Sequence, residues 1–245
     1  MILFFILGTF IGSFLNVIII RLPKNKSIVT PRSHCPNCKE KIPFYLNIPI
    51  ISYTLLRGKC KYCKNKISSQ YILVEVITGV IFYLLFLHFP DNPEKALLLS
   101  LIFCCLIIIS VIDFYHFLVP SLLILILLIT LIPYSLLFHI NLTNILWGAI
   151  AITSYLGGSA YLISIIKKNK EILGFGDILL SIFIGAYLGI LDGLLCLFIA
   201  SIIGLLYALF NASNNRKIPF ATCLSISFSI IVFSEICFNL KLFLF

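Results

Sequence analysis

The sequence predicts an all-α protein that crosses a membrane about eight times and carries a small zinc-stapled loop domain in the cytosol. Hydrophobic residues make up 61% of the 245 positions and charged residues only 11%, whereas a soluble domain has about a quarter charged residues. A water-soluble fold of this size cannot bury so much apolar surface, so the lipid bilayer is the expected solvent. Apolar runs of spanning length recur along the chain, and basic residues collect between them.

The expected spans follow from the length of each apolar run, since a membrane helix needs about 20 mostly apolar residues. The first run has no basic residues before it and no small-residue cleavage site, so it is interpreted as a retained helix rather than a signal peptide. The sixth run is short and poorly separated from the seventh. The expected spans are 1–20, 71–89, 96–113, 117–138, 144–166, 178–188, 191–210 and 218–240.

The distribution of Lys and Arg predicts the orientation, because cytoplasmic loops of membrane proteins are enriched in both. With the N-terminus outside, the inner segments 21–70, 167–177 and 211–217 hold 16 of the 18 basic residues. Both termini are therefore expected outside the cytosol. Segment 21–70 could also be interpreted as a nucleic-acid patch, but its place between two apolar spans favours a cytoplasmic loop, and we expect no nucleic-acid partner.

Three regions are expected: a first membrane helix at 1–20, a cytosolic four-cysteine loop at 21–70, and a seven-helix membrane domain at 71–245 that carries the chemistry. The loop is too short to bury a good apolar core, so it needs a staple. The spacing Cys35-x2-Cys38 and Cys60-x2-Cys63 supplies one, because paired CxxC knuckles at this separation are typical of zinc sites.

Four thiolates fill a tetrahedral shell and leave no open position, so the predicted zinc is structural rather than catalytic. One alternative is a pair of redox-active dithiols, although such CxxC motifs usually come singly and in a thioredoxin-like context. Another is that His34, next to Cys35, replaces one of the ligands, although a solvated loop histidine is the simpler interpretation.

Two carboxylates are placed where carboxylates are costly. Asp113 ends the third expected span and Asp177 begins the sixth, both on the inner side. An ionisable group in a span indicates function by default, and two close carboxylates share a proton, so one can act as base and the other as acid. Gly174 and Gly176, just before Asp177, would let a substrate backbone approach closely.

Alternatives remain for these acids. Each could be a helix-edge carboxylate at the membrane surface, or Asp113 and Asp177 could relay protons or cations in a transporter. Asp192 is assigned to a loop between spans. Glu75 and Gly79 share one face of the second span, and a solvated, snorkelling Glu75 is the simplest interpretation.

Several motifs together resemble the bacterial type IV prepilin peptidases, the leader peptidases and N-methyltransferases of the GxGD aspartic membrane protease family A24. The similarity runs in order from residue 8 to about 225. Its motifs are Gly12-Ser-Phe-Leu-Asn16, Arg21-Leu-Pro23, Arg32-Ser-His-Cys35-Pro-Asn-Cys38, Asn47-Ile-Pro49, Arg57-Gly-Lys-Cys60-Lys-Tyr-Cys63, Val74-Glu75, Thr78-Gly79, Ile112-Asp113, Gly174-Phe-Gly176-Asp177 and Ile218-Pro-Phe220.

The resemblance implies an enzyme of the bacterial cytoplasmic membrane that removes the basic leader of prepilins or pseudopilins after a glycine, at the cytosolic face. Asp113 and Asp177 match the catalytic pair of the family. The resemblance also implies S-adenosylmethionine-dependent methylation of the new N-terminal residue, which Glu75 and Gly79 are candidates to support. A peptidase without methylation, and a zinc module that only docks partners, are the remaining alternatives.

The chain departs from the family pattern at three places. Ser121 stands where the family usually has Asp or Asn, and Leu179 where it often has Lys. The last motif continues as Ala221-Thr222 rather than Gly-Pro. No departure removes a predicted catalytic group, so we expect them to affect substrate preference and fine positioning.

Overall fold

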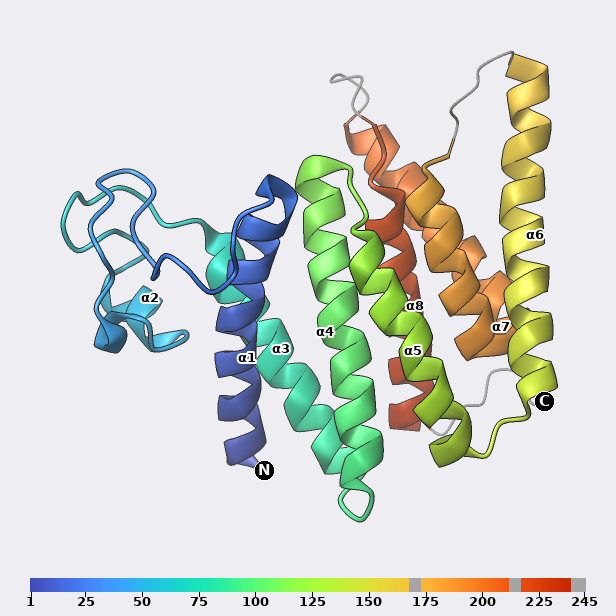
Figure 1. The fold of residues 1–245 in the computed structure, drawn as a ribbon, viewed down its shortest axis with the longest axis horizontal. Coiled ribbons are helices and arrows are strands. Elements are labelled where there is room, and N and C mark those ends of the chain that lie inside the picture. Colours follow the sequence, from blue (N-terminus) through green and yellow to red (C-terminus); the bar gives the residue numbers. More distant parts are fainter. Residues whose placement is uncertain (168–172, 212–216, 239–245) are drawn as a thin grey trace. The chain divides into compact units, whose positions relative to one another are not determined.

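A computed structural model describes residues 1–167, 173–211 and 217–238, and within these ranges the secondary structure is helical apart from isolated bridges (Figure 1). This confirms the predicted all-α class. The helices are α1 (Ile2–Arg21), η1 (Leu22–Lys24), η2 (Phe44–Leu46), α2 (Ile51–Leu55), α3 (Ser69–His88), α4 (Pro93–His116), α5 (Ser121–Phe138), α6 (Leu142–Lys167), α7 (Phe175–Phe210) and α8 (Phe220–Phe238).

Among the described residues, 6 helices are long and apolar enough to cross a membrane, and α8 is a shorter apolar helix. The sixth and seventh expected spans form one helix, α7, which is interrupted only at Gly189 with φ 79° and ψ −165°. A left-handed φ of this kind is readily adopted only by glycine, so Gly189 divides α7 where the sequence left the boundary open. The multi-pass class is confirmed, while the number eight and the orientation stay predictions. Residues 239–240, which end the last expected span, lie outside the described ranges, as do parts of the expected inner segments 167–177 and 211–217.

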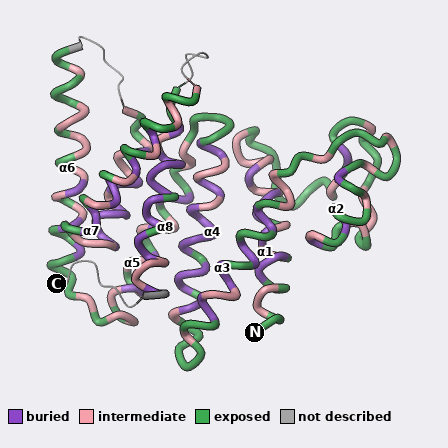
Figure 2. The backbone as a smooth tube through the Cα atoms, turned by 180° about the vertical axis from the view of Figure 1, so that it is seen from behind, coloured by how far each residue is buried: buried purple, intermediate pink, exposed green. Residues whose placement is uncertain are grey.

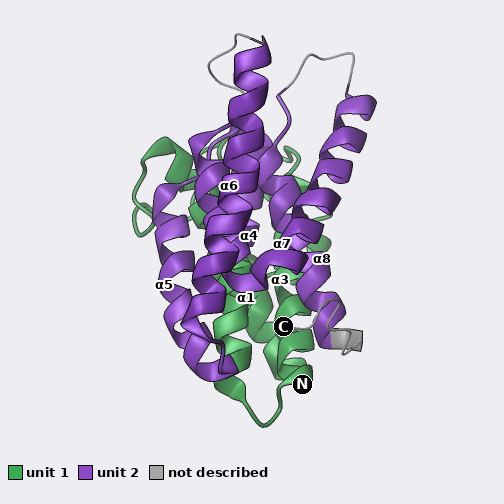
Figure 3. Cartoon of the chain, turned by 90° about the vertical axis from the view of Figure 1, so that its right-hand side faces the viewer, with its two compact units in different colours: residues 1–104 green, residues 105–245 purple. Residues whose placement is uncertain are grey.

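The chain divides into two compact units, Met1–Cys104 and Cys105–Phe245 (Figure 3). The first contains α1, the cysteine loop, α3 and the start of α4. The second contains the end of α4 and helices α5 to α8. Both predicted carboxylates belong to the second unit, and all four predicted metal ligands belong to the first.

Small residues let α1 and α3 pack closely in the first unit. A Cβ added to Gly8 would lie 2.8 Å from the Cβ of Phe82, and one added to Gly12 would lie 2.8 Å from the Cα of Glu75. Such small-residue seams are how membrane helices gain dispersion contacts where the hydrophobic effect between helices is weak. The seam fixes the N-terminal helix against the helix that follows the cysteine loop.

The second unit is built around α7, which packs against α6, α8 and α5. Gly148 and Gly185 let the α6 and α7 backbones touch. The rings of Tyr134 and Tyr187 stack with centroids 4.2 Å apart, and the Tyr134 hydroxyl donates to the Tyr187 carbonyl at 3.2 Å. This core fixes the α7 segment that starts at the Gly-x-Gly-Asp motif.

Burial differs sharply between helices of this fold (Figure 2). In the most apolar stretch of α4, 67% of residues are buried, compared with 6% in that of α6. An apolar helix exposed on this scale needs lipid around it, in agreement with the bilayer as solvent.

The prediction that Asp192 lies in a loop is wrong. Asp192 is buried inside α7, and its Oδ1 has no hydrogen-bond partner among the described residues.

Candidate active site and metal cluster

The four loop cysteines form one cluster. Their sulfur atoms all lie within 4.8 Å of one another. The Sγ atoms of Cys35 and Cys63 are 3.8 Å apart, and those of Cys38 and Cys60 are 4.0 Å apart. A tetrahedral zinc with Zn–S bonds of about 2.3 Å requires S···S distances of about 3.8 Å. The donor set and its spacing therefore fit zinc.

Each pair of cysteines sits in a knuckle of the same design. In the first, the Cys35 N–H donates to the Glu40 carbonyl at 3.0 Å and Lys39 has a φ of 59°. In the second, the Cys60 N–H donates to the Asn65 carbonyl at 2.8 Å and Lys64 has a φ of 60°. The repeated backbone turn places two thiols from each knuckle on one side of the loop.

The electrostatics of the cluster favour a bound cation. The backbone N–H groups of Cys63 and Tyr62 lower the pKa of Cys60 to about 6, so this thiol is a ready thiolate. The pKa of Cys38 rises to about 11, although the Glu40 N–H lowers it, because desolvation and the other thiols of the cluster act in the opposite direction. A divalent ion among the four sulfurs would stabilise all four thiolates and so offset the repulsion between them.

Asp113 is buried in the last turn of α4, with 4% of its surface exposed. A negative charge is disfavoured at a helix C-terminus, but Asp113 faces the N-terminus of α8, where unpaired N–H groups favour an anion. Its Oδ2 accepts hydrogen bonds from the Thr222 N–H at 2.9 Å and from the Thr222 hydroxyl at 3.0 Å. The carboxylate is thereby held by a helix more than 100 residues away in sequence.

Asp177 is buried in the first turn of α7, where a carboxylate is stabilised by the helix N-terminus. Gly174 is the N-cap of this helix, and its N–H interacts with the Asp177 side chain. A Cβ at Gly174 would lie 3.2 Å from the Asp177 Oδ2, and one at Gly176 would lie 2.5 Å from the Cβ of Val119. Gly174 thus leaves the carboxylate uncrowded, and Gly176 lets α7 start directly against the segment before α5.

The two carboxylates come together in the second unit. Asp177 interacts electrostatically with Asp113, and the Cys223 thiol interacts with both. A pair of close carboxylates, one on α4 and one on α7, is the arrangement that the sequence predicted. Thr222 and Cys223 were not predicted as site residues, although Ala221-Thr222 stood out as a departure from the family motif.

Glu75 is buried, with 7% of its surface exposed, so the interpretation of a solvated, snorkelling side chain is wrong. Its Oε2 accepts a hydrogen bond from the Ile50 N–H at 2.8 Å. Ile50 has a φ of 61°, which is costly for a β-branched residue, and this bond helps to hold it. Gly79 packs against Thr9 and Phe5 of α1, where a Cβ would lie 2.8 Å from the Thr9 methyl. Both residues therefore organise the first unit.

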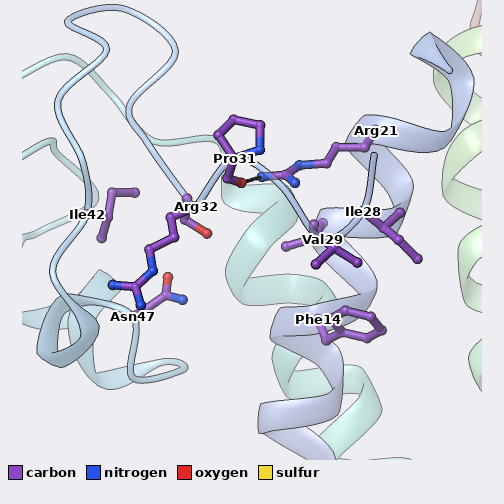
Figure 4. Close-up of a pocket in the computed structure, with 10 residues that line it drawn as sticks. Phe14, Arg21, Ile28, Val29, Pro31, Arg32, Ile42 and Asn47 are labelled. Atoms are coloured by element: carbon purple, nitrogen blue, oxygen red, sulfur yellow. Dashed lines mark hydrogen bonds between the residues drawn. The ribbon is translucent and has the colours of Figure 1, made fainter. Parts of the chain in front are cut away.

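A cavity of about 280 Å³ lies in the first unit, where the loop returns to the end of α1 (Figure 4). Arg21 and Arg32 line it together with apolar groups that include Phe14. The Arg21 guanidinium donates to the carbonyls of Ser27 at 2.9 Å and Pro31 at 2.6 Å. Arg21 thus fastens the start of the loop to α1, and none of the predicted site residues lines the cavity.

Comparison with known proteins identifies the family. Residues 6–89 match the bacterial peptidase A24 N-terminal domain, and residues 100–209 match the type IV leader peptidase family. The chain belongs to the type IV leader peptidase family. The first match covers the region with the cysteine cluster, and the second covers both carboxylates. The predicted family is confirmed.

Curated relatives of this family cover nearly the whole chain. A type 4 prepilin-like proteins leader peptide-processing enzyme of Escherichia coli is 33% identical over 89% of this chain and 88% of its own length. A prepilin leader peptidase/N-methyltransferase of Vibrio cholerae is 34% identical over 96% of both chains. One of Pseudomonas aeruginosa is 32% identical over 91% of this chain and 86% of its own. No solved structure matches the chain.

Proposed function

We propose that this chain is an aspartic leader peptidase in which Asp113 and Asp177 hydrolyse a peptide bond at the membrane edge. The observation that carries the proposal is the pair of buried, electrostatically coupled carboxylates at adjoining helix ends of one compact unit. Family membership and the names of the relatives agree with it. No relative reported above has a transporter name, and nothing else supports a proton- or cation-coupled transporter.

The chemistry is general acid–base catalysis. One carboxylate takes a proton from a water molecule as the water oxygen bonds to the scissile carbonyl carbon. The other, protonated at that moment, gives its proton to the departing amine nitrogen as the C–N bond breaks. The products are a carboxylic acid and an amine, and one proton passing between the two carboxyl groups restores the starting state, so no covalent intermediate is needed.

The substrate is the second part of the proposal. Several relatives are named for prepilin leader processing, so we assign prepilins or pseudopilins with a basic leader, cleaved after a glycine. The apolar part of such a substrate lies in the bilayer, and its leader lies with the basic segments in the cytosol. This requires both chain termini outside the cytosol, in the bacterial inner membrane.

Zinc and methylation complete the proposal. Zinc held by Cys35, Cys38, Cys60 and Cys63 folds the loop, since its four thiolates leave no position for a substrate. The relatives' names include N-methyltransferase, so the new N-terminal amine is methylated, with S-adenosylmethionine as the methyl donor. Glu75 and Gly79 support this second activity by fixing α1, α3 and the loop segment at Ile50.

The decisive experiment is cleavage of a prepilin-type substrate in membranes by the wild type, Asp113→Asn and Asp177→Asn. Loss of a member of a catalytic pair is expected to lower the rate by at least about a thousandfold. Asp192→Asn is the matched control, because Asp192 is a buried acid of the same unit outside the pair. A cleavage rate equal to that of the wild type in either Asp113→Asn or Asp177→Asn, at normal protein levels, would contradict the assignment. Intact mass of the product then shows whether a methyl group has been added.

A further inference from the structure

The two carboxylates of the proposed pair have unequal surroundings. Asp113 interacts with the N–H groups of Ala221 and Thr222 and with the Thr222 hydroxyl. Among the residues that the structure describes, Asp177 interacts with one backbone donor, the N–H of Gly174. Hydrogen bonds to an ionised group are roughly twice as strong as neutral ones, so three donors favour negative charge on Asp113 more than one donor does on Asp177.

The Thr222 hydroxyl has a second partner. Its oxygen lies 3.0 Å from the Asp113 Oδ2 and 2.9 Å from the Ser110 carbonyl oxygen. A hydroxyl has one proton and two lone pairs, so it donates to one of these oxygens at a time. It donates to Asp113 when that carboxylate is charged. When Asp113 is protonated, the hydroxyl can turn to Ser110 and accept from the carboxylic acid instead.

We infer that Thr222 is a positioning residue that makes Asp113 the general base of the pair and leaves the shared proton on Asp177, the general acid. This inference rests on the proposed peptidase function. The hydroxyl proton faces Asp113 before catalysis and swings to the Ser110 carbonyl once Asp113 has taken the proton of the attacking water. A single side chain thereby satisfies Asp113 in both of its protonation states.

The sequence of this chain supplies the donors at position 222. After the residues that match Ile218-Pro-Phe220, the motif of the family usually continues with Gly-Pro. A proline at position 222 would bring neither an N–H nor a hydroxyl. Thr222 supplies both and is 8% exposed, so water does not compete freely for Asp113. Thr222, which departs from the family motif, therefore provides two hydrogen-bond donors to Asp113.

The test compares Thr222→Val with Thr222→Ser by the pH dependence of kcat/KM for leader cleavage in membranes. Valine keeps the shape and the backbone N–H but removes the hydroxyl. We expect the acidic limb of the profile to move up by about one pH unit, with cleavage at pH 7 reduced about tenfold or less. Serine restores the hydroxyl, so its limb should return close to that of the wild type.

The titratable groups that face Asp113 limit how the profile is interpreted. Within residues 1–167, 173–211 and 217–238 they are Asp177 on α7 and Cys223 on α8, while Tyr115 and His116 on its own helix are exposed. Asp177 is part of the pair, whose two apparent ionisations belong to both carboxyl groups. A Cys223→Ala background removes the thiol, and the shift caused by Thr222→Val is expected to persist in it.

The control is Ser225→Ala, which removes a buried hydroxyl one turn further along α8 that donates to the Ala221 carbonyl. Its profile should match that of the wild type. An unchanged profile for Thr222→Val, or a serine variant that behaves like valine, would overturn the inference. A shift of the alkaline limb alone would assign Asp113 as the acid and overturn it as well. In each of these outcomes the wild type still cleaves and Asp177→Asn does not, so the proposed function stands independently.

Discussion

The cysteine cluster and the aspartate site are built in opposite ways. The closest sulfur pairs join residues 28 and 22 positions apart, each presented by a short knuckle with its own backbone hydrogen bonds. The bond from Thr222 to Asp113 joins residues 109 positions apart and depends on the packing of whole helices. One site is assembled by local turns and a metal, and the other by the tertiary fold.

This difference separates what can damage each site. The loop has little apolar core, so its structure should depend on the metal. Asp113 and Asp177 are buried, so their site should depend on close packing and on single hydrogen-bond donors. Removing a metal ligand should therefore affect the loop most, whereas an added methyl group next to Asp177 should affect the aspartate site most.

The largest effect is expected from breaking the metal site. Cys60→Ser removes one of four thiolates, and because structural zinc contributes about 10–16 kcal/mol of apparent binding free energy, the loop should lose both its zinc and its fold. Zinc content and trypsin sensitivity of segment 21–70, which is rich in Lys and Arg, measure this directly.

Two results sharpen that prediction. Cys105→Ala, at a buried cysteine outside the cluster, should keep wild-type zinc content. Some leader cleavage should survive Cys60→Ser, because none of the metal ligands belongs to the aspartate pair. Full zinc content in Cys60→Ser would contradict the four-thiolate site.

The next effect tests packing at the aspartate site. Gly176→Ala places a Cβ about 2.5 Å from the Cβ of Val119, so α7 must shift where Asp177 is held. Overpacking of this kind costs about 1–3 kcal/mol, and we expect cleavage to fall at least tenfold while zinc content is unchanged. Gly157→Ala, with nothing within 4 Å of the added Cβ, is the matched control and should remain fully active.

Rescue makes this prediction stricter. Val119→Gly removes the Cβ that an added Cβ at Gly176 would meet at 2.5 Å, together with both methyl groups behind it, so the double variant Gly176→Ala/Val119→Gly should recover much of the lost cleavage. If the double variant were no better than Gly176→Ala alone, the contact with Val119 would not explain the glycine.

A smaller effect is expected at the seam of the first unit. Gly12→Ala would bring a Cβ to 2.8 Å from the Glu75 Cα and should destabilise the α1–α3 pair by about 1–3 kcal/mol. The thermal midpoint in detergent should fall, and methylation should fall more than cleavage, because Asp113 and Asp177 lie in the other unit. Equal loss of both activities would contradict this separation.

The smallest effect concerns the helix that follows the loop. Ser68 is the N-cap of α3, and its side chain accepts a hydrogen bond from the Gln70 N–H. Ser68→Ala should cost about 1 kcal/mol, while Ser68→Asp should retain the cap. Thermal unfolding in detergent measures the difference, and an alanine variant as stable as the aspartate variant would show that the cap contributes nothing.

The all-α membrane class, the family and the clustering of the four cysteines could all be predicted from the sequence, which also singled out the two carboxylates of the proposed pair. These depend on apolar run length, on short fixed spacings and on the high cost of charge in a bilayer, which are local properties of the chain. Three features became visible only in the folded chain: Asp192 lies buried inside α7, Glu75 accepts a hydrogen bond from the strained Ile50, and Thr222 donates to Asp113. Such partners depend on which helix faces meet, and no pattern within one helix specifies the neighbour that supplies the hydrogen bond.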